Sequence, residues 1–539
     1  MEELSFVDVD IMLRHVGDFD RFQYLLIGLF SLINILSGFH YFGQTFISVT
    51  PEYKCKPSPY DDVNKTTYLA CYKTIQEGAT TKKVACNSGW DYNTSYGYIS
   101  IVQEMDWVCN DSWPPVVAHS FFYVGAVLGS FALGILADRI GRLRVLIIAN
   151  MIVIVGNMAT AMSTHPIAYI ISRFLAGAAT DTNFVMMYII VMEYIRPKMR
   201  TAGLNLCIGV FYCISCVVVP WLAVGLRTWK WFLVAISLPH LSVLSFAILV
   251  PESAQWLLSK GRTDEAIACF ERIARFNRRT VDPKVLAELR KYANEHIKTV
   301  RNENLIGLIS TPRLRKKMLI LMFKSMVMSL GYDTIARNVN GFGFSPFTIF
   351  SICSITILPA CVVILFLQDR WGRKALASGA LFISGLFSAI GGVILVINQY
   401  TSPILIIAIS IICRFSINVA YNSGAQYAVE LIPTVVRGQG VSAIHVIGYI
   451  ANFCSPSILY MGEMWKPSPD LLLAVLLIFG AFACLFLPET LNKTLPVTLE
   501  DGENFGEDER FYEFYCCGGR GDDSVEILNP GIYKIKYIN

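Results

Sequence analysis

Ionisable and aromatic side chains stand inside several long apolar stretches of this chain. A charged group is costly inside a membrane, so such a residue marks a candidate functional site. Two carboxylates and one ammonium could hold an organic ion by charge. Neighbouring rings could hold a cation by contacts that contribute about 2 kcal/mol each when desolvated. The candidate substrate-binding residues are Asp181, Phe184, Tyr188, Lys324, Tyr332, Asp333, Asn422 and Tyr449. The sequence shows no convergent acid–base or nucleophile set, so we expect no enzyme.

A second group of charges stands where the apolar stretches end. Acids and arginines share these short segments, so they can form ion pairs that hold in one conformation and break in another. We therefore expect a gating network. The alternative is that the charges only anchor the helix ends at one membrane face. The residues of this network are Asp138, Arg139, Arg142, Glu193, Arg200, Asp369, Arg370, Arg373, Glu430 and Arg437.

The composition is that of a polytopic membrane protein. The chain has 539 residues, of which 54% are hydrophobic and 16% are charged, against about 25% charged residues in an average soluble domain. A spanning helix needs about 20 mostly apolar residues. Twelve stretches meet this condition, near 22–42, 116–137, 145–163, 167–192, 202–225, 230–250, 317–337, 346–367, 376–397, 403–430, 438–461 and 470–487. The first stretch lacks a cleavage pattern, so we interpret it as a retained helix and not as a signal peptide.

Basic residues set the expected orientation in the plasma membrane. The segment 251–317 contains fifteen Lys or Arg, whereas the short loops 164–166 and 398–402 contain none. Cytoplasmic loops carry an excess of Lys and Arg. The segments that we therefore expect on the cytoplasmic side are 1–21, 251–316 and 488–539. The middle one of these has amphipathic spacing, which predicts short helices lying against the membrane face.

The segment 43–115 is then expected outside the cell, and its residue types agree with that location. Its four cysteines predict two disulfides in an oxidising compartment, with three possible pairings. These cysteines are Cys55, Cys71, Cys86 and Cys109. Sequences that accept N-glycosylation occur at Asn64, Asn93 and Asn110. Cysteines in the apolar stretches, such as Cys213 and Cys216, are interpreted as small core residues, so we expect no metal site.

Four features of the first half recur in the second half in the same order. The first of them returns 231 residues later. The features and their counterparts are Asp138-Arg139 and Asp369-Arg370, Arg173 and Arg414, Glu193 with Arg200 and Glu430 with Arg437, and Pro251-Glu252-Ser253 and Pro488-Glu489-Thr490. Repeats of this kind occur in membrane transporters. The sequence therefore predicts an all-α membrane protein with twelve transmembrane helices in two parallel six-helix repeats, 22–250 and 317–487.

Parallel six-helix halves joined by a long cytoplasmic linker resemble the major facilitator superfamily. More specific motifs resemble its organic cation, organic anion and carnitine transporters over nearly the whole chain. The motifs are Cys86-Asn-Ser-Gly89-Trp90, Val108-Cys109-Asn-Asp-Ser-Trp113, Pro251-Glu252-Ser253 with Trp256-Leu257-Leu258, and Thr311-Pro312 with Leu314-Arg315-Lys316. This resemblance implies a substrate site near the membrane midplane, between two halves that rock against each other.

At several positions the chain differs from what the resemblance leads us to expect. Cation transporters of the family carry an Asp, and anion and carnitine members carry an Arg, where this chain has Tyr449. The family usually carries a Lys at the position of Asp181, and its cation members carry a Glu at the position of Ile357. The charges that mark substrate class in the family are therefore rearranged in this chain.

Two interpretations of the binding site stay open. In the first, Asp181 and Asp333 supply the negative field for a cation, and the aromatic rings line its site. In the second, Asp181 pairs with Lys324, and a nearly neutral site suits a zwitterion or an anion. The same pair could instead serve gating or folding. We expect a secondary transporter of small organic ions, with cations or cationic zwitterions favoured over organic anions and carnitine-type zwitterions.

The expected energy source and partners follow from the same residues. No phosphate-binding loop is present, so we expect no direct use of ATP and no cofactor. Transport would be facilitated, or coupled to an ion or to the membrane potential, which contributes about 2.3 kcal/mol per charge per 100 mV. The partners are the organic ion, the lipid bilayer and, for coupled transport, an ion, and we expect no nucleic acid. A different class of function would be a non-transporting receptor or scaffold built on a transporter fold.

Overall fold

In the part of the chain that the computed structural model describes, twelve helices or runs of consecutive helices are long and apolar enough to cross a membrane. The structure describes residues 9–17, 20–59, 61, 65–77, 80–195, 197–296, 310–338, 344–398, 402–433, 436–491, 493, 495–496 and 498–507. The spans are α2 (Arg21–Ile47), α4 (Trp113–Ile140), α5 (Arg142–Ala161), α6 (Pro166–Gly177) with α7 (Thr180–Tyr194), α8 (Pro197–Leu226), α9 (Trp229–Ser237) with η3 (Leu238–Ser245) and α10 (Phe246–Leu249), α15 (Pro312–Arg337), α16 (Pro346–Ile355) with α17 (Ile357–Trp371), α18 (Arg373–Ile397), α19 (Pro403–Leu431), α20 (Arg437–Asn452) with α21 (Ser455–Met464), and α22 (Ser468–Leu485). Each overlaps one predicted stretch, so the twelve predicted spans are confirmed.

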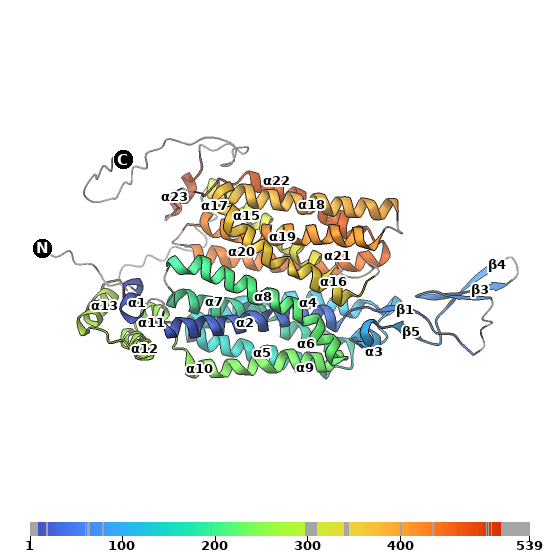
Figure 1. Ribbon diagram of the computed structural model, residues 1–539, viewed down its shortest axis with the longest axis horizontal. Coiled ribbons are helices and arrows are strands. Elements are labelled where there is room, and N and C mark those ends of the chain that lie inside the picture. The colour runs from blue at the N-terminus through green and yellow to red at the C-terminus, as the bar shows by residue number, and fades with distance from the viewer. Residues whose placement is uncertain are drawn as a thin grey trace.

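The spans form two halves, which we call the N-terminal half (α2 to α10) and the C-terminal half (α15 to α22). Figure 1 shows the helices of the first half, coloured blue to green, beside those of the second half, coloured yellow to red, with their long axes nearly aligned. Each half contributes six of the twelve spans. The predicted architecture of two six-helix halves is therefore confirmed.

The charged hairpin of each half is built in the same way. The chain turns at Gly141 with a φ of 109° and at Gly372 with a φ of 88°, values that favour glycine. The Glu252 carboxylate accepts hydrogen bonds from the backbone N–H groups of Arg142 and Leu143, at 2.8 and 3.0 Å. In the second half the Glu489 carboxylate takes the same place and accepts from two backbone N–H groups of α18, at 2.9 and 3.2 Å. The repeated Pro-Glu motif therefore caps the N-terminus of the helix that follows each hairpin.

The fourth span is interrupted, and this break positions a candidate binding residue. The backbones of helices α4 and α6 approach each other closely at Gly129. A Cβ at this position would overlap the carbonyl oxygen of Ala178, so only glycine fits there. Small residues allow this close backbone approach in membrane proteins. The helix breaks between Gly177 and Thr180 and restarts as α7. Asp181 therefore lies in the first turn of a new helix, next to α4 in the interior of the bundle.

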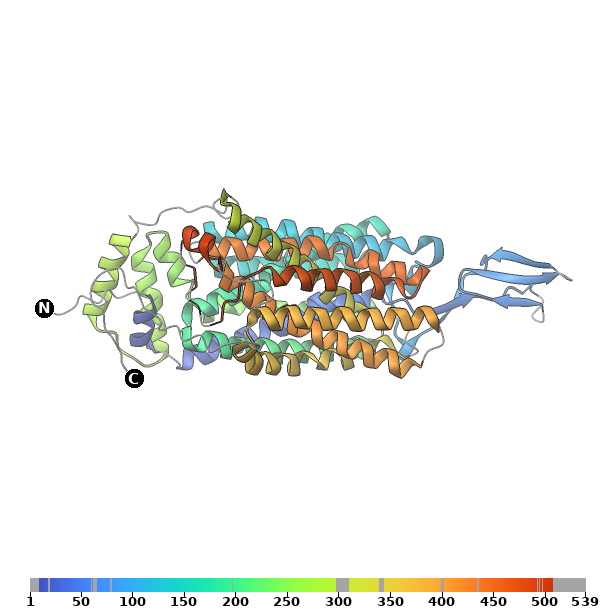
Figure 2. The ribbon, with the colours of Figure 1, turned by 90° about the horizontal axis from the view of Figure 1, so that it is seen from above.

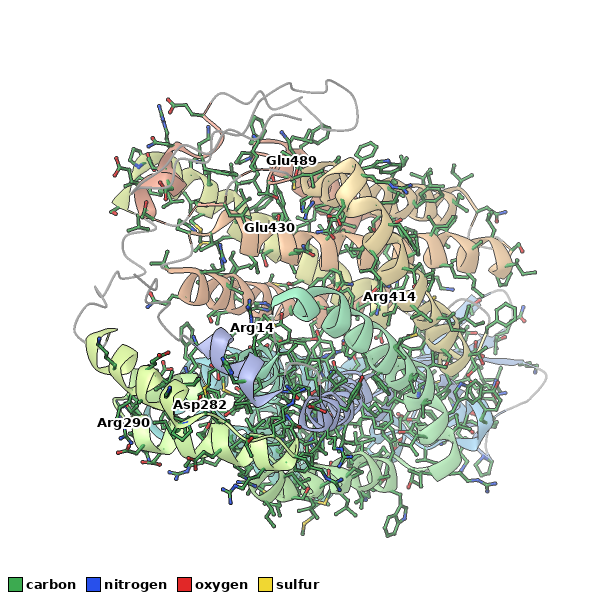
Figure 3. The ribbon with its side chains drawn as sticks, turned by 60° about the vertical axis from the view of Figure 1, so that its left-hand side comes forward. Arg14, Asp282, Arg290, Arg414, Glu430 and Glu489 are labelled. Carbon is green, nitrogen blue, oxygen red and sulfur yellow. A yellow bond between two sulfur atoms is a disulfide. The ribbon has the colours of Figure 1, made fainter. Side chains whose placement is uncertain are left out.

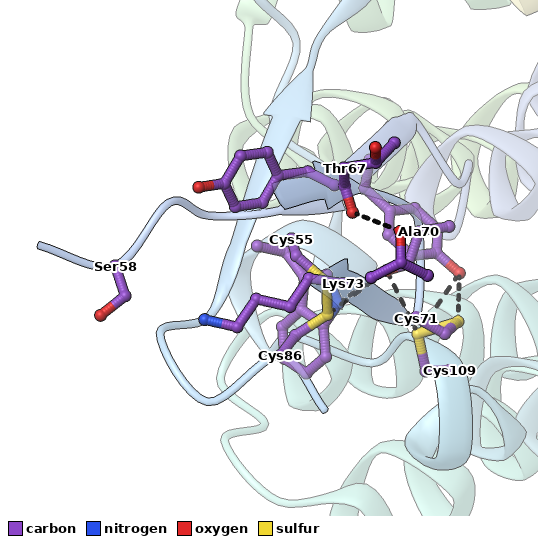
Figure 4. Close-up of a disulfide and its surroundings, with 12 residues drawn as sticks. Cys55, Ser58, Thr67, Ala70, Cys71, Lys73, Cys86 and Cys109 are labelled. Atoms are coloured by element: carbon purple, nitrogen blue, oxygen red, sulfur yellow. Dashed lines mark hydrogen bonds between the residues drawn. A yellow bond between two sulfur atoms is a disulfide. The ribbon is translucent and has the colours of Figure 1, made fainter. Parts of the chain in front are cut away.

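The segment between α2 and α4 projects beyond one end of the helices, as Figures 1 and 2 show. Strand β1 (Glu52–Cys55) pairs antiparallel with β5 (Trp90–Asn93), and β2 (Thr66–Tyr68), β3 (Tyr72–Glu77) and β4 (Thr80–Ala85) form a second antiparallel sheet. The short helices η1 (Ser95–Gly97), α3 (Ile101–Glu104) and η2 (Cys109–Asp111) follow. Disulfides join Cys55 to Cys86 and Cys71 to Cys109 (Figure 4). The four cysteines thus form two disulfides, with one of the three possible pairings.

At the opposite end the described residues form the short helices α1 (Val9–Val16), α11 (Ala254–Ser259), α12 (Thr263–Phe276) and α13 (Pro283–His296). Their apolar faces pack with one another and with the N-terminal half in one core, and not only against a membrane face as the spacing suggested. Asn277 accepts a hydrogen bond from the Phe22 N–H at 2.9 Å and donates one to the Val16 carbonyl at 3.1 Å. The linker helices are therefore fastened to the first half.

A short helix after the last span fastens to the second half. Helix α23 (Leu499–Asn504) places the Glu503 carboxylate at the start of α15, where it accepts from the N–H groups of Arg313 and Leu314 at 2.8 and 2.6 Å. The Lys317 ammonium donates to the Gly502 carbonyl at 2.9 Å. From the sequence we expected only that the segment 488–539 is cytoplasmic. Residues 508–539 lie outside the described part of the chain.

The buried cores show how the two halves meet. At the end that carries the β-strands, side chains of both halves share one core, in which Phe42 and Phe46 contact Phe350 with ring centroids 5.2 Å apart. At the opposite end the N-terminal half and the C-terminal half have separate cores. The halves are therefore packed together toward the end that bears the strands.

Candidate functional site

Asp181 joins the two halves near the middle of the spans. Its carboxylate accepts a hydrogen bond from the Ser130 hydroxyl of α4 at 3.2 Å and from the Tyr449 hydroxyl of α20 at 3.1 Å. Its side chain is half-buried. None of the hydrogen bonds or ion pairs found in the described residues joins Asp181 to an arginine or lysine. Asp181 is thus a carboxylate between the halves whose partners are both neutral hydroxyls.

Aromatic rings lie along the same helix as Asp181. The rings of Phe184 and Tyr188 are stacked with centroids 6.0 Å apart, and Phe30 of α2 lies 6.1 Å from Phe184. The ring of Tyr449 lies 6.5 Å from that of Tyr123 on α4. Phe184 and Tyr188 are only partly buried. The structure therefore places three of the candidate aromatic residues, Phe184, Tyr188 and Tyr449, on the helices that carry or contact Asp181.

Two other candidates lie on the C-terminal half. Tyr332 contacts Tyr421 with ring centroids 4.8 Å apart. The Asn422 amide donates to the Asn418 carbonyl at 3.0 Å and is half-buried. No contact in the described residues joins Tyr332 or Asn422 to Asp181. That these two residues belong to the same binding site as Asp181 stays a prediction.

Lys324 has partners that differ from those of Asp181. Its ammonium is fully buried, donates to the Gly424 carbonyl of α19 at 2.7 Å and lies 5.3 Å from the Tyr427 ring. The second interpretation of the site paired Asp181 with Lys324. Among the described residues, no hydrogen bond or ion pair joins these two side chains. Both groups are bound to other partners in this conformation.

Asp333 forms an ion pair that the sequence analysis did not anticipate. Its Oδ1 lies 2.8 Å from Nε of Arg337, four residues later on α15, and both side chains are buried. The Tyr41 hydroxyl of α2 donates to the same oxygen at 2.8 Å. Arg337 in turn donates to the Thr45 hydroxyl at 2.5 Å and to the Tyr123 hydroxyl at 3.3 Å. The carboxylate that was expected to bind substrate is therefore neutralised, and its pair joins the C-terminal half to α2 and α4.

Two further buried arginines occupy equivalent places in the two halves. Arg173 donates to the Asn157 amide oxygen at 2.9 Å and lies 5.1 Å from the Phe122 ring. Arg414 donates to the Tyr332 carbonyl at 2.9 Å and lies 4.3 Å from the ring of the same residue. The internal repeat of the sequence paired Arg173 with Arg414, and the structure shows in addition that both side chains are buried. Their cationic side chains rest on rings and neutral acceptors.

The predicted gating residues lie at the end opposite the β-strands. Ion pairs join Asp138 to Arg142 at 2.8 Å, Asp369 to Arg373 at 3.1 Å, and Arg373 to Glu430 at 3.2 Å. Figure 3 shows Glu430 and Glu489 in the C-terminal half, above Arg14 of α1 and above Asp282, which precedes α13.

The remaining gating candidates have other surroundings. Arg139 and Arg370 are exposed, and Arg437 donates to the Ile432 carbonyl at 3.3 Å. Glu193 lies near the end of α7, and the side chain of Arg200 lies outside the described residues. The two hairpins therefore share one equivalent ion pair, Asp138–Arg142 and Asp369–Arg373. The gating role of these charges stays a prediction.

The predicted glycosylation sites fall on the projecting segment. Asn93 is exposed at the end of β5, and Asn110 is exposed in η2. Asn64 lies outside the described residues. Sugar attachment at these asparagines stays a prediction.

Two six-helix halves, a repeated charged hairpin and a polar site between the halves together define a membrane transporter of the major facilitator class. A sequence profile described as "Sugar (and other) transporter" matches residues 71–498. An organic cation transporter protein of Drosophila melanogaster is 28% identical over 528 residues, covering 92% of this chain and 95% of the relative. The organic anion transporter 3 of Oryctolagus cuniculus is 28% identical over 515 residues, covering 92% and 93%.

The fold is also that of solved transporters. The inward-open conformation of the xylose transporter XylE from E. coli has a TM-score of 0.61 at 14% identity, covering 89% of this chain and 99% of that chain. The chain belongs to the sugar and other transporter family of the major facilitator superfamily, and it is similar over most of its length to transporters named for organic cations and for organic anions.

Proposed function

We propose that the protein carries small organic cations across the plasma membrane by alternating access, as a secondary transporter. We propose that the β-strands face the extracellular side and that both termini face the cytoplasm. The cation binds between the halves near Asp181, and the rings of Phe184, Tyr188 and Tyr449 lie around it.

One observation carries this proposal, which is the environment of Asp181. Its carboxylate is half-buried between the halves, and in the described part of the chain its hydrogen bonds come from hydroxyl groups. Away from the helix ends, the cationic side chains of the described spans are almost fully buried: Lys324 is 0%, Arg414 1%, Arg173 2% and Arg337 4% exposed. The charge that a ligand can reach is therefore negative. A carboxylate in a low-dielectric site attracts a cation strongly when no protein cation neutralises it.

The packing supports alternating access. The two halves share a core and several hydrogen bonds toward the β-strand end, including Ser120 to the Phe453 carbonyl at 3.0 Å and Ser112 to Tyr460 at 3.1 Å. Their cores are separate at the other end. We infer a conformation that is closed to the outside, with the binding site facing the cytoplasm.

A second candidate is transport of organic anions or carnitine-type zwitterions. Lys324 and Arg414 have no carboxylate partner among the contacts of the described residues. If these helices separate in the outward-facing conformation, the two cationic groups would meet the substrate first. The relatives include transporters named for cations and for anions, so the uptake experiment has to include both classes.

Uptake by cells that express the full chain tests the proposal. The panel contains tetraethylammonium as cation, p-aminohippurate as anion and carnitine as zwitterion. We expect uptake of the cation, and a loss of at least about tenfold in Asp181→Asn, because a neutral amide replaces the charge. Asp264→Asn, at an exposed acid of α12, is the matched control. Unchanged affinity for every cation in Asp181→Asn contradicts the cation proposal, and no uptake of any probe favours a receptor or scaffold.

A further inference from the structure

We propose that helix α12 and the end of the sixth span form a binding site for one anionic phospholipid of the cytoplasmic leaflet. The phosphate lies at Arg272 and Arg275, and an acyl chain lies along Leu241, Leu244 and Ile248. This site is separate from the candidate substrate site. The inference uses the proposed function only for the orientation, which assigns α12 to the cytoplasmic side of the membrane.

An apolar stripe leads along the sixth span toward α12. Leu241 and Leu244 of η3 and Ile248 of α10 are exposed, and Ile248 reaches 75%. Their spacing of three and then four residues places the three side chains on one side of the span. A lipid chain is about as apolar as a leucine side chain. The bilayer therefore supplies the partner that this stripe fits.

Arg272 of α12 lies at the end of the stripe. Its guanidinium donates a hydrogen bond to the backbone carbonyl of Ile248. Helix α10 ends one residue later, at Leu249, where the last carbonyls of a helix have no partner within it. Figure 1 shows α10 along one edge of the bundle and α12 beyond its end. The contact thus fixes a cationic group at the boundary between the apolar stripe and the linker helices.

Helix α12 presents two arginines on its exposed face. Its opposite face is buried in the core of the N-terminal half, through residues such as Phe270 and Ile273. Arg272 and Arg275 are both exposed, and their spacing of three residues places them on one face of the helix. Arg275 donates to the Glu271 carbonyl of its own helix at 3.4 Å. Neither guanidinium has a carboxylate partner among the contacts of the described residues.

Nearby acids are mostly paired with other basic residues. The ion pairs of this region join Arg262 to Glu265, Arg290 to Asp264, and Arg279 to Asp20. Glu271 is exposed, but it points about 100° around the helix from Arg272. The charge at the end of the apolar stripe is therefore positive.

An anionic phospholipid matches both parts of the site. A guanidinium binds phosphate oxygens through two parallel hydrogen bonds. The cytoplasmic leaflet has a negative surface potential, and each basic residue near it contributes about fivefold in affinity. A phosphate without chains would make no contact with the stripe, and an uncharged lipid would leave the arginines without a counter-charge. We therefore assign the site to a lipid that has both a negative headgroup and acyl chains.

Native mass spectrometry of the purified full-length protein in detergent tests the inference, because it resolves each bound lipid. The probes are phosphatidylserine, phosphatidylcholine with the same chains, and soluble glycerophosphoserine. We expect phosphatidylserine to bind at least about fivefold more tightly than phosphatidylcholine. Glycerophosphoserine should bind at least about tenfold more weakly than phosphatidylserine, because it lacks the chains. Equal affinity for the two lipids, or for phosphatidylserine and its soluble headgroup, overturns the proposal.

Variants locate the binding. Arg275→Gln removes no contact with another helix among the described residues, and it should weaken phosphatidylserine binding about fivefold. Arg272→Gln with Arg275→Gln should weaken it about 25-fold and abolish the preference over phosphatidylcholine. Ile248→Asn should weaken both lipids alike.

Arg290→Gln is the matched control, because Arg290 is an exposed arginine of α13 that pairs with Asp264. It should bind phosphatidylserine as the original protein does, and the Tm of each variant checks that it is folded. If the double variant keeps the original affinity, or if Arg290→Gln loses as much as Arg275→Gln, the assigned site is wrong. Binding in detergent is measured without transport, so the cation proposal stands or falls separately, in the uptake experiment.

Discussion

Tyr41 of the first span donates a 2.8 Å hydrogen bond to Asp333 of the seventh span, across the boundary between the two halves. The same carboxylate oxygen is paired with Arg337, and Arg337 reaches back to Thr45 and Tyr123 of the N-terminal half. The ion pair itself lies within α15, so it moves with the C-terminal half. In the proposed transport cycle, its partners on α2 and α4 must release it when the β-strand end opens.

This contact predicts that Tyr41→Phe shifts the protein toward the open state at the β-strand end. A hydrogen bond to a charged group contributes about 1.5–3 kcal/mol, so the closed state should lose about tenfold in population or more. The measurement is labelling of Ala118→Cys, a buried reporter in the shared core, by an impermeant thiol reagent. We expect faster labelling in Tyr41→Phe than in Tyr92→Phe, whose hydroxyl binds Asp106 within the projecting segment. Equal rates would show that Tyr41 does not hold the closed state.

The hydrogen bond between Tyr449 and Asp181 predicts a gain in affinity when it is removed. In Tyr449→Phe the substrate cation no longer competes with this hydroxyl for the Asp181 oxygen. The KM of tetraethylammonium uptake should fall several-fold, up to about tenfold, and kcat should fall with it because the bound form is more stable. Tyr421→Phe is the matched control, since no hydrogen bond joins its hydroxyl to Asp181 among the described contacts. A higher KM in Tyr449→Phe would mean that the hydroxyl helps to bind the substrate.

The carboxylates that cap the hairpin helices predict an effect on stability. Glu489→Ala removes two hydrogen bonds to the N-terminus of α18, and loss of a helix cap typically lowers stability by about 1 kcal/mol. Glu252→Ala should behave alike, because it occupies the equivalent place before α5. Thermal unfolding of detergent-purified protein measures the change in Tm. Glu500→Ala on exposed α23 should leave Tm unchanged, and equal Tm values in all three variants would contradict this role.

The exposed acid of the first hairpin predicts an effect on turnover rather than on folding. Asp138 is 70% exposed in its pair with Arg142, and exposed ion pairs contribute little to stability. We therefore expect Asp138→Asn to reach the cell surface normally and to transport more slowly, as part of the gating network. Asp369→Asn, its repeat counterpart, should show the same split. Normal turnover at normal surface expression would rule out a gating role for Asp138.

The number and place of the spans could be predicted from sequence, because a spanning helix reveals itself through the hydropathy of its own residues. The halves could be predicted because Asp138-Arg139 and Pro251-Glu252 have recognisable copies downstream. The pairing of the four cysteines depends on the register of the strands that carry or adjoin them, which the sequence does not reveal. Cys55 stands opposite Trp90, and Tyr72 stands opposite Ala85. The sequence therefore left three pairings open.

The candidate site was predicted only in part. The sequence located Asp181 and Tyr449 separately, and the fold joins them. Arg337 was missed, although it stands four residues after Asp333 on one helix, the spacing at which opposite charges meet. Tyr41 could not have been found, because its contact depends on how α2 rotates against α15. Among the described contacts no hydrogen bond or ion pair joins Asp181 to Lys324, and Lys324 donates to the Gly424 carbonyl of α19 instead.

At the end opposite the β-strands, each half carries a short helix that is fixed to it. Helix α12 is held to the N-terminal half through Asn277 and a common core, and α23 is held to α15 through Glu503. Neither attachment depends on a contact in the candidate substrate site. A pair of spectroscopic labels, one on each of these two helices, would therefore follow the rocking of the halves as a change in distance, with every membrane-spanning residue left as it is.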